Sequence, residues 1–192
     1  MPVTMPSPPA DSLRALARAI EGSPAASREY LGAAAGAPSA WLPQKLYTID
    51  VQDLADGKPI GDVARDVGWR YVLPQPLGAA VSAEVRPDAA GRHRVAHFAQ
   101  GPQTLQTLEL TRQLVEEPRF AAEEYTLQAL IVPALYILAL WLKNPDPDRD
   151  WFVPVEPTDP RLVPGRYYES PAFNDLLRSL AQERMRHPTP EM

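Results

Sequence analysis

Hydrophobic residues are densest between Leu127 and Leu142, and the structure of this stretch decides the class of the protein. Counted back from Leu142, the apolar run reaches Ala129 before Gln128 interrupts it, and Pro133 lies inside it. A membrane-spanning helix needs about 18 to 20 consecutive apolar residues, and a proline costs about 3 kcal/mol in a helix interior. The run is therefore too short for a membrane span, and its proline argues against a buried helix.

Two strands fit this run better than a helix. The segments Tyr125–Val132 and Ala134–Leu142 contain several β-branched and aromatic residues, and Pro133 is tolerable at a bend between them. In the second segment, alternate residues on both sides of the strand are apolar, so both faces need cover. Helices could cover one face while the other meets a second layer or a partner chain, or the chain's own helices could cover both.

Helical spacing of apolar residues predicts an N-terminal, a central and a C-terminal helix. These helices cover residues 11–22, 102–117 and 170–187. The last helix is the most regularly amphipathic, and it starts with the N-cap residue Ser170 followed by Pro171. A shorter helical turn is expected after Asp62 and ends at Gly68.

Runs rich in β-branched and aromatic residues, separated by turn residues, predict the strands. They cover residues 46–51, 69–73, 79–86, 93–100, 125–132, 134–142 and 151–155. Runs of strands between helices favour an α+β fold. We therefore predict a mostly antiparallel sheet of about five to seven strands, packed with the three helices.

The length of 192 residues suggests a single domain, which we place at residues 11–187. The proline-rich lead, residues 1–10, and the tail, residues 188–192, are expected to be disordered. The lead also lacks the basic start and the continuous apolar segment of a secretory signal. Together with the absence of cysteine, this favours the cytoplasm.

The composition excludes several kinds of chemistry. Without cysteine the chain has no disulfides, thiolate zinc sites, iron–sulfur ligands or cysteine nucleophile. Its net charge of −5 disfavours nucleic acid as a partner, because an acidic protein repels phosphate unless it has a concentrated basic patch. Frequent alanine and arginine with little lysine suggest a bacterial source.

Metal binding is not expected from the two patterns that resemble metal sites. His93 and His97 have the spacing of two ligands on one face, but Arg94 stands where a zinc protease has its glutamate. The aspartates of residues 146–150 resemble the first half of a calcium-binding loop. Its later positions, which should hold a glycine and a glutamate, are Trp151 and Pro157 here. There is also no phosphate-binding glycine loop and no nucleophile elbow, so we expect no cofactor.

The predicted order is helix, strands, helix, strands, helix. Bacterial secretion chaperones are small acidic proteins with the order helix, three strands, helix, two strands, helix, which this topology resembles; they work as dimers that bind an unfolded segment of a partner. The proline-rich loop of residues 143–165 and the additional strands depart from that architecture. The resemblance implies a dimeric, non-enzymatic protein.

Our leading hypothesis is a cytoplasmic, non-enzymatic protein-interaction module of the chaperone or adaptor kind, which binds a protein partner or forms a homodimer, without nucleic acid or membrane. The interface candidates are Tyr136, Leu138, Leu140, Tyr167 and Tyr168. The alternative is a small-molecule-binding protein or an enzyme with a pocket between sheet and helices. Its pocket candidates are His93, His97, Tyr125, Tyr136 and Arg166.

Overall fold

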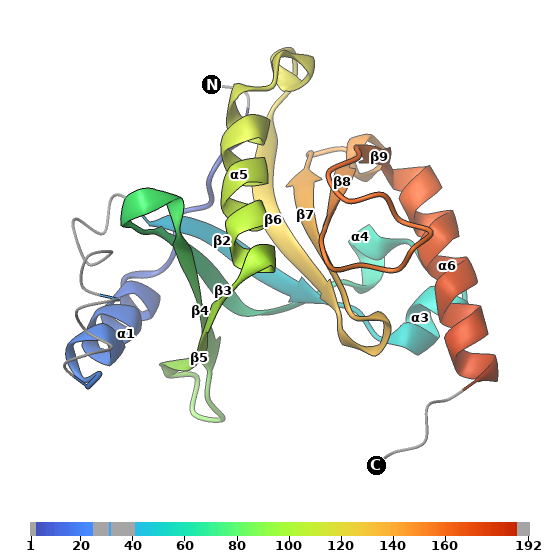
Figure 1. The fold of residues 1–192 in the computed structure, drawn as a ribbon. Coiled ribbons are helices and arrows are strands. Elements are labelled where there is room, and N and C mark those ends of the chain that lie inside the picture. Colours follow the sequence, from blue (N-terminus) through green and yellow to red (C-terminus); the bar gives the residue numbers. More distant parts are fainter. Residues whose placement is uncertain (1–2, 25–30, 32–40, 188–192) are drawn as a thin grey trace.

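The computed structural model describes residues 3–24, 31 and 41–187 of the chain, which contain five helices and a nine-stranded sheet (Figure 1). The helices are α1 (Ala10–Glu21), α3 (Val51–Ala55), α4 (Ile60–Val63), α5 (Pro102–Glu116) and α6 (Ser170–Arg186). The strands are β1 (Val3–Thr4), β2 (Leu42–Thr48), β3 (Arg65–Pro74), β4 (Ala80–Pro87), β5 (His93–Gln100), β6 (Tyr125–Val132), β7 (Ile137–Lys143), β8 (Trp151–Val155) and β9 (Tyr168–Glu169).

The sheet has the strand order β5-β4-β3-β2-β6-β7-β8-β9, with β1 pairing beside β6. All neighbours are antiparallel except β2 with β6 and β1 with β6. The predicted mixed fold with a mostly antiparallel sheet is therefore confirmed, but the predicted number of strands was too low. The two additional strands, β1 and β9, have two residues each, which is too short for any periodicity to reveal.

The first of these additional strands lies in the lead that was predicted to be disordered. Val3 is 1% exposed and packs among the side chains beneath α5, while Thr4 donates its hydroxyl hydrogen to the carbonyl of Tyr125 at 3.2 Å. Burial of one apolar side chain and pairing of the backbone with β6 order this part of the lead. The predicted disordered tail, residues 188–192, lies outside the described residues.

Both faces of β7 are covered by the chain's own helices. Leu138 and Leu140 are buried in one cluster with Leu114 of α5. Ala139 and Trp141 point to the opposite face and are buried in a second cluster with residues of α6. We call these two sides of the sheet the α5 face and the α6 face. The two-sided apolar strand is therefore satisfied within one chain.

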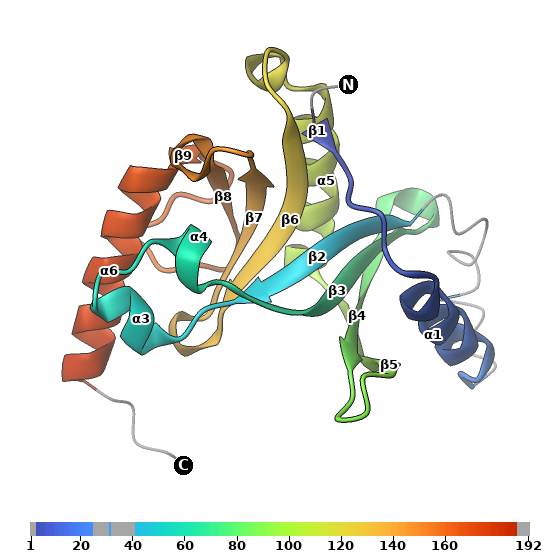
Figure 2. The ribbon, with the colours of Figure 1, turned by 180° about the vertical axis from the view of Figure 1, so that it is seen from behind.

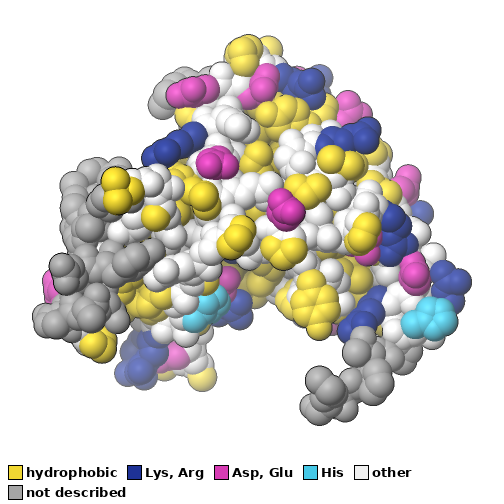
Figure 3. Space-filling model, in the orientation of Figure 1, with side chains coloured by type: hydrophobic (Ala, Val, Ile, Leu, Met, Phe, Trp, Pro, Cys, Tyr) yellow, Lys and Arg dark blue, Asp and Glu magenta, His cyan; other side chains and the backbone are white. Residues whose placement is uncertain are grey.

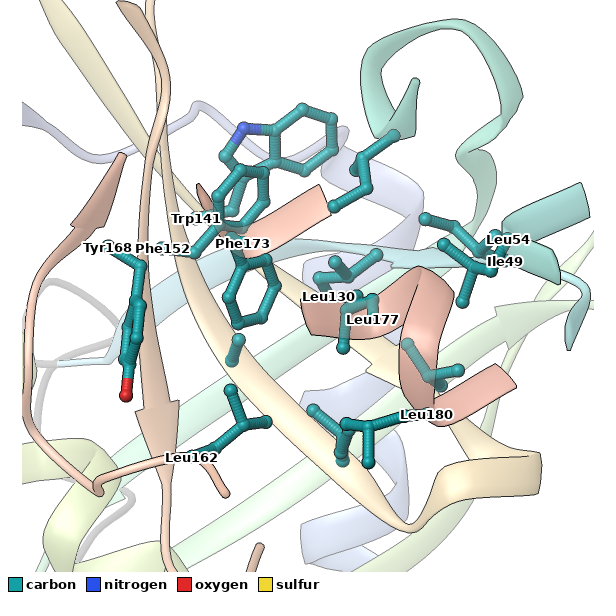
Figure 4. Close-up of a cluster of buried hydrophobic side chains, with 14 of the residues drawn as sticks. Ile49, Leu54, Leu130, Trp141, Phe152, Leu162, Tyr168, Phe173, Leu177 and Leu180 are labelled. Atoms are coloured by element: carbon teal, nitrogen blue, oxygen red, sulfur yellow. The ribbon is translucent and has the colours of Figure 1, made fainter. Parts of the chain in front are cut away.

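Stacked aromatic rings join β7, β8 and α6 on the α6 face (Figure 4). The ring centres of Trp141 and Phe152 are 5.6 Å apart, and those of Phe152 and Phe173 are 4.6 Å apart. The indole Nε1 of Trp141 donates a hydrogen bond of 2.8 Å to the buried carboxylate of Asp150. Large buried rings of this kind stabilise the position of α6 on the sheet.

Helix α1 covers the other end of the same face (Figures 1 and 2). Its buried residues Leu16 and Ile20 pack with Trp69 and Tyr71 of β3. The hydroxyl groups of Ser12 and Tyr71 are 2.7 Å apart, so a hydrogen bond also joins the helix to the strand. The α6 face therefore has helical cover at both ends.

The sheet forks in its middle, where β6 changes its neighbour on one edge. Tyr125 and Thr126 pair with β1, whereas residues from Gln128 to Ile131 pair with β2. Figure 2 shows β2 turning away from β6 at this point, with β1 beside the upper part of β6. The fork therefore lies at the centre of the α6 face, in the part of the sheet between α1 and α6.

Among the described helices, none is long and apolar enough to cross a membrane.

Candidate functional site

One row of paired residues crosses the five central strands of the sheet on the α6 face. Its order is Trp69 on β3, Lys45 on β2, Gln128 on β6, Trp141 on β7 and Phe152 on β8. Paired residues in neighbouring strands point to the same side of a sheet. The ends of the row are apolar and covered by helices, whereas its two central side chains are polar. The chain thus places polar groups where the sheet forks.

A depression of about 430 Å³ lies at this fork, and we call it the β6 cleft. It is lined by Thr4, Glu124, Tyr125, Thr126, Gln128, Lys143, Asn144 and Pro145. This volume lies within the range of roughly 300–1,000 Å³ found for small-molecule pockets.

Gln128 contributes a buried amide without a partner to the cleft. The residue is 7% exposed, and its Oε1 atom makes no hydrogen bond within the described part of the chain. Leaving a buried amide oxygen unpaired costs about 1–3 kcal/mol, and native proteins contain few such atoms. A ligand that donates a hydrogen bond to this oxygen would remove that cost.

Two of the three lysines of the chain lie beside this amide. The ammonium of Lys143 is 4.6 Å from the ring centre of Trp141 and 5.6 Å from that of Tyr47, and it has no carboxylate within ion-pair distance among the described residues. Such cation–π contacts orient the charge without neutralising it. Lys143 therefore offers a free positive charge at the cleft.

Lys45 differs from Lys143 because it has an acidic partner. Its Nζ lies 3.0 Å from the carboxylate of Asp66 and 5.6 Å from the ring centre of Tyr47. Partial burial lowers the pKa of Lys45, but the hydrogen bonds and charges of Asp66 and Tyr47 outweigh it and hold the pKa above its usual value. Lys45 therefore stays protonated, but Asp66 balances its charge, so the free positive charge beside Gln128 is that of Lys143.

The end of the cleft near the β7–β8 connection is held rigid by Asn144. Its Nδ2 donates to the carbonyl of Glu124 at 3.1 Å, and its backbone N–H donates to Asp150 at 2.7 Å. Burial raises the pKa of Asp150, while the bonds from Asn144 and Trp141 oppose that rise. These contacts fix the cleft wall before any ligand arrives, which lowers the entropic cost of binding.

The structure does not bring the five predicted pocket residues together. Tyr125 lines the β6 cleft, and its hydroxyl donates to Glu123 at 3.0 Å. The other candidates lie elsewhere: His93 beside α1, His97 near Glu84 on β4, Tyr136 at the β6–β7 turn and Arg166 over the ring of Tyr168. Only Tyr125 therefore belongs to the cleft that the fold forms.

The predicted interface residues are also divided. Tyr136 is 79% exposed and has a left-handed backbone with φ of 54°, as the last residue of the turn that begins at Pro133. Leu138 and Leu140 are buried under α5 and cannot contact a partner while α5 covers this face of the sheet. Tyr168 is also buried, and its hydroxyl accepts from the N–H of Val163. The hydroxyl of Tyr167 donates to the carboxylate of Glu117 at 3.2 Å.

Sequence reasoning missed Gln128, Lys45 and Lys143 as site residues. A signal was nevertheless present, because Gln128 is the one polar residue inside the apolar stretch from Leu127 to Leu142. A glutamine at an inward position of a central strand indicates either an internal partner or a ligand. The pairing of Gln128 with Lys45 depends on contact between strands far apart in the sequence, which the residue pattern does not reveal.

A second polar row lies on the α5 face, where Gln44, Arg70 and Glu84 are paired neighbours. Arg70 is 5% exposed, its Nε has no hydrogen-bond partner among the described residues, and burial lowers its pKa while the charge of Glu84 opposes that shift. The Nη2 atom of Arg70 is 3.4 Å from the hydroxyl of Ser82. Because α5 covers this row, its groups face the interior of the protein, away from any ligand in the β6 cleft.

Neither possible metal-binding residues nor comparison with other proteins adds a further candidate site. In the described ranges, no group of three or more histidine, aspartate or glutamate residues is placed to hold a metal ion. No family model, curated protein or solved structure matches the chain. The β6 cleft is therefore the strongest candidate on geometry alone.

Proposed function

We propose that the protein binds a small organic acid in the β6 cleft. The observation that carries this proposal is the buried, unpaired amide oxygen of Gln128 beside the free ammonium of Lys143. Evolution rarely keeps a buried polar group without a partner unless the group has a use. This proposal develops the small-molecule alternative of the sequence analysis.

The chemistry of the cleft defines the class of ligand. The ammonium of Lys143 favours a carboxylate, because charge-assisted hydrogen bonds are stronger than neutral ones. The Oε1 atom of Gln128 needs an N–H or O–H donor. A carboxylic acid with a neighbouring hydroxyl or amino group supplies both, so we propose 2-hydroxy or 2-amino acids as ligands.

Binding is better supported than catalysis. The lining contains no histidine, and the raised pKa of Lys45 makes that residue a poor base at neutral pH. Since the chain has no cysteine, we further propose that it acts in a reducing compartment such as the cytoplasm.

The test compares three ligands that differ by one group: propionate, lactate and alanine. Calorimetric titration of the full chain is expected to show lactate or alanine binding about tenfold more tightly than propionate, because only these two donate to Gln128. Gln128→Leu should remove that difference, and Lys143→Met should weaken binding of all three. Gln44→Leu is the matched control, because Gln44 is also buried with an unpaired Oε1 but lies under α5.

The same variants have a readout without ligand. Gln128→Leu is expected to raise the free energy of unfolding by about 1–2 kcal/mol, because an unpaired amide is replaced by an apolar group of similar size. Loss of stability in this variant, or the absence of saturable binding of both lactate and alanine, would count against the proposal.

A protein-interaction role, including the dimeric chaperone or adaptor role, is a second proposal. Its original support was an uncovered face of β7, and α5 and α6 now cover both faces. What favours it is Tyr136, a large exposed ring held in a backbone conformation that residues other than glycine rarely adopt. Replacement of Tyr136 by serine should weaken partner binding without loss of folding if this role is correct.

A further inference from the structure

A second depression, separate from the β6 cleft, lies between α1 and the turn that joins β4 to β5. Its volume is about 610 Å³. The lining residues are Asp11, Arg14, Ala15, Arg18, Gly91, Arg92, His93, Arg94 and Val95, and we call it the arginine pocket. Packing of α1 against β5 creates it, because Val95 contacts the apolar cluster that includes Leu16 and Ile20. The fold thus unites basic residues from distant parts of the sequence.

The pocket has the opposite charge to the rest of the protein. Its four arginines carry one positive charge each, and the carboxylates of Asp11 and the adjacent Asp88 cancel two of these charges. The pocket is left with a net charge of two positive units. Since the whole chain carries −5, the remainder carries −7. Figure 3 shows basic side chains with an acidic one between them at the lower end of the sheet, over the β4–β5 turn. A concave site of one charge sign concentrates ligands of the other sign.

Asp88 fixes two of these arginines in place. Its Oδ1 accepts the backbone N–H groups of Ala90 and Arg92 at 2.9 and 3.0 Å, and its Oδ2 lies 3.1 Å from the Nε atoms of Arg92 and Arg94. The backbone hydrogen bond from Arg92, followed by that from Ala90 and the charge of Arg92, lowers the pKa of Asp88 to about 2. The carboxylate is therefore ionised at neutral pH and holds the guanidinium groups without rearrangement.

Several donors in this pocket remain free. Within the described residues, the guanidinium of Arg18 has no hydrogen-bond or ion-pair partner, and only the Nε of Arg94 is engaged. Arg14, in contrast, is paired with Asp11. Free guanidinium donors beside an excess of positive charge favour an anion with several acceptor oxygens.

We propose that the arginine pocket binds the phosphate group of a small phosphorylated molecule. A phosphate monoester carries about −1.5 to −2 charges at neutral pH and three strong acceptor oxygens, which match the two uncompensated charges and the free donors. The volume exceeds what a single phosphate group fills, so we assign the remaining space to the organic part of the ligand. This site is independent of the function proposed for the β6 cleft.

The test is calorimetric titration of the full chain with glycerol phosphate, inorganic phosphate and glycerol. Saturable binding of glycerol phosphate is expected, with inorganic phosphate weaker and glycerol inactive. Tighter binding of inorganic phosphate than of glycerol phosphate would assign the site to the free ion and overturn the organic part of the proposal. Binding of an oligonucleotide without binding of glycerol phosphate would overturn the proposal entirely.

Matched variants locate the site. Arg18→Gln and Arg94→Gln are each expected to weaken binding of glycerol phosphate by about tenfold, because each removes a free charged donor. Arg112→Gln, at an exposed position on α5, and Gln128→Leu, in the β6 cleft, should leave the affinity unchanged. Equal effects of Arg18→Gln and Arg112→Gln would show that binding depends only on the net charge of the protein, and would overturn the assignment of the binding site to the arginine pocket. Thermal unfolding of each variant checks that the fold is intact.

Discussion

Tyr71 shows how one buried residue links the fold to pH. It is fully buried, and its hydroxyl is hydrogen-bonded to that of Ser12 on α1. Burial raises the pKa of Tyr71 to about 12, and the bond to Ser12 opposes part of the rise. Ionisation of this phenol inside the protein would place an uncompensated charge beside α1, so the folded state keeps the proton.

This shift predicts loss of stability in alkali. An unfolded tyrosine ionises near pH 10, so the stabilisation by protonated Tyr71 is complete below about pH 10 and is lost as the pH rises towards 12. Urea unfolding measured at about pH 9 and again at about pH 11 gives the decline in the free energy of unfolding between them. We expect a smaller decline for Tyr71→Phe than for the natural chain. Absorbance of tyrosinate should show one late titration that this variant lacks. Identical declines in both proteins would contradict the assignment.

Two glycines with positive φ test the close approach of β3 and β4. A Cβ on Gly68 (φ 132°) would lie 2.2 Å from the carbonyl oxygen of Val85, whereas a Cβ on Gly78 (φ 78°) would meet nothing within 4 Å. Both substitutions by alanine incur backbone strain of about 1–2 kcal/mol. In Gly68→Ala, the new methyl group must also push β3 and β4 apart. We therefore expect this variant to lower the free energy of unfolding, measured in urea, by about 3 kcal/mol or more. Equal costs would show that the strands can move apart freely.

At the scale of elements, α5 differs most from its predicted packing. At helical spacing, Leu105, Leu108, Arg112 and Val115 share one face of this segment. The buried residues are instead Thr104, Thr107, Leu108, Leu110, Thr111 and Leu114. The threonines pack over a polar part of the sheet: Gln44 donates to Thr111 at 3.0 Å, and the hydroxyls of Ser82 and Thr104 are 3.2 Å apart. A periodicity of apolar residues cannot identify a face that is buried through polar contacts.

The packing of α5 predicts a clear contrast between two of its leucines. Leu114 is fully buried in the cluster with Leu138 and Leu140, while Leu105 is only partly buried. Leu114→Ala should lower the free energy of unfolding by about 2–5 kcal/mol because it leaves a cavity, and Leu105→Ala should cost less than about 1 kcal/mol. Chemical denaturation of both variants measures this difference. A larger effect at Leu105 would mean that α5 is rotated about its axis.

Local sequence signals predicted most elements, and their failures have local causes. The strands β5, β6 and β8 have the predicted bounds. Residue 51 was expected to end a strand, but Asp50 accepts the N–H of Gln52 at 2.9 Å and starts α3 instead. An aspartate before a short apolar run signals a helix N-cap as well as a turn, so the pattern was ambiguous.

At the scale of the whole molecule, the fork in the sheet is the feature that no local signal contains. The β6 cleft exists because β6 pairs with β1 along one part of an edge and with β2 along the next. Both contacts are parallel and join segments that are distant in the chain, so their register depends on how the complete sheet packs. The cleft residue Gln128 was visible in the sequence, but its position between Lys45 and Trp141 was not.

The same architecture predicts the oligomeric state. A second subunit was one way to cover the apolar faces of β7, yet α5 buries Leu138 and Leu140 while α6 buries Ala139 and Trp141. Stable dimers usually need an apolar surface that the monomer leaves open, and the chain has closed the largest one that its sequence suggested. We therefore expect light scattering over a concentration series to give the mass of one chain throughout. A stable dimer that Tyr136→Asp dissociates would contradict this expectation, and it would favour the interaction role, because Tyr136 is the one predicted interface residue that is fully presented to a partner.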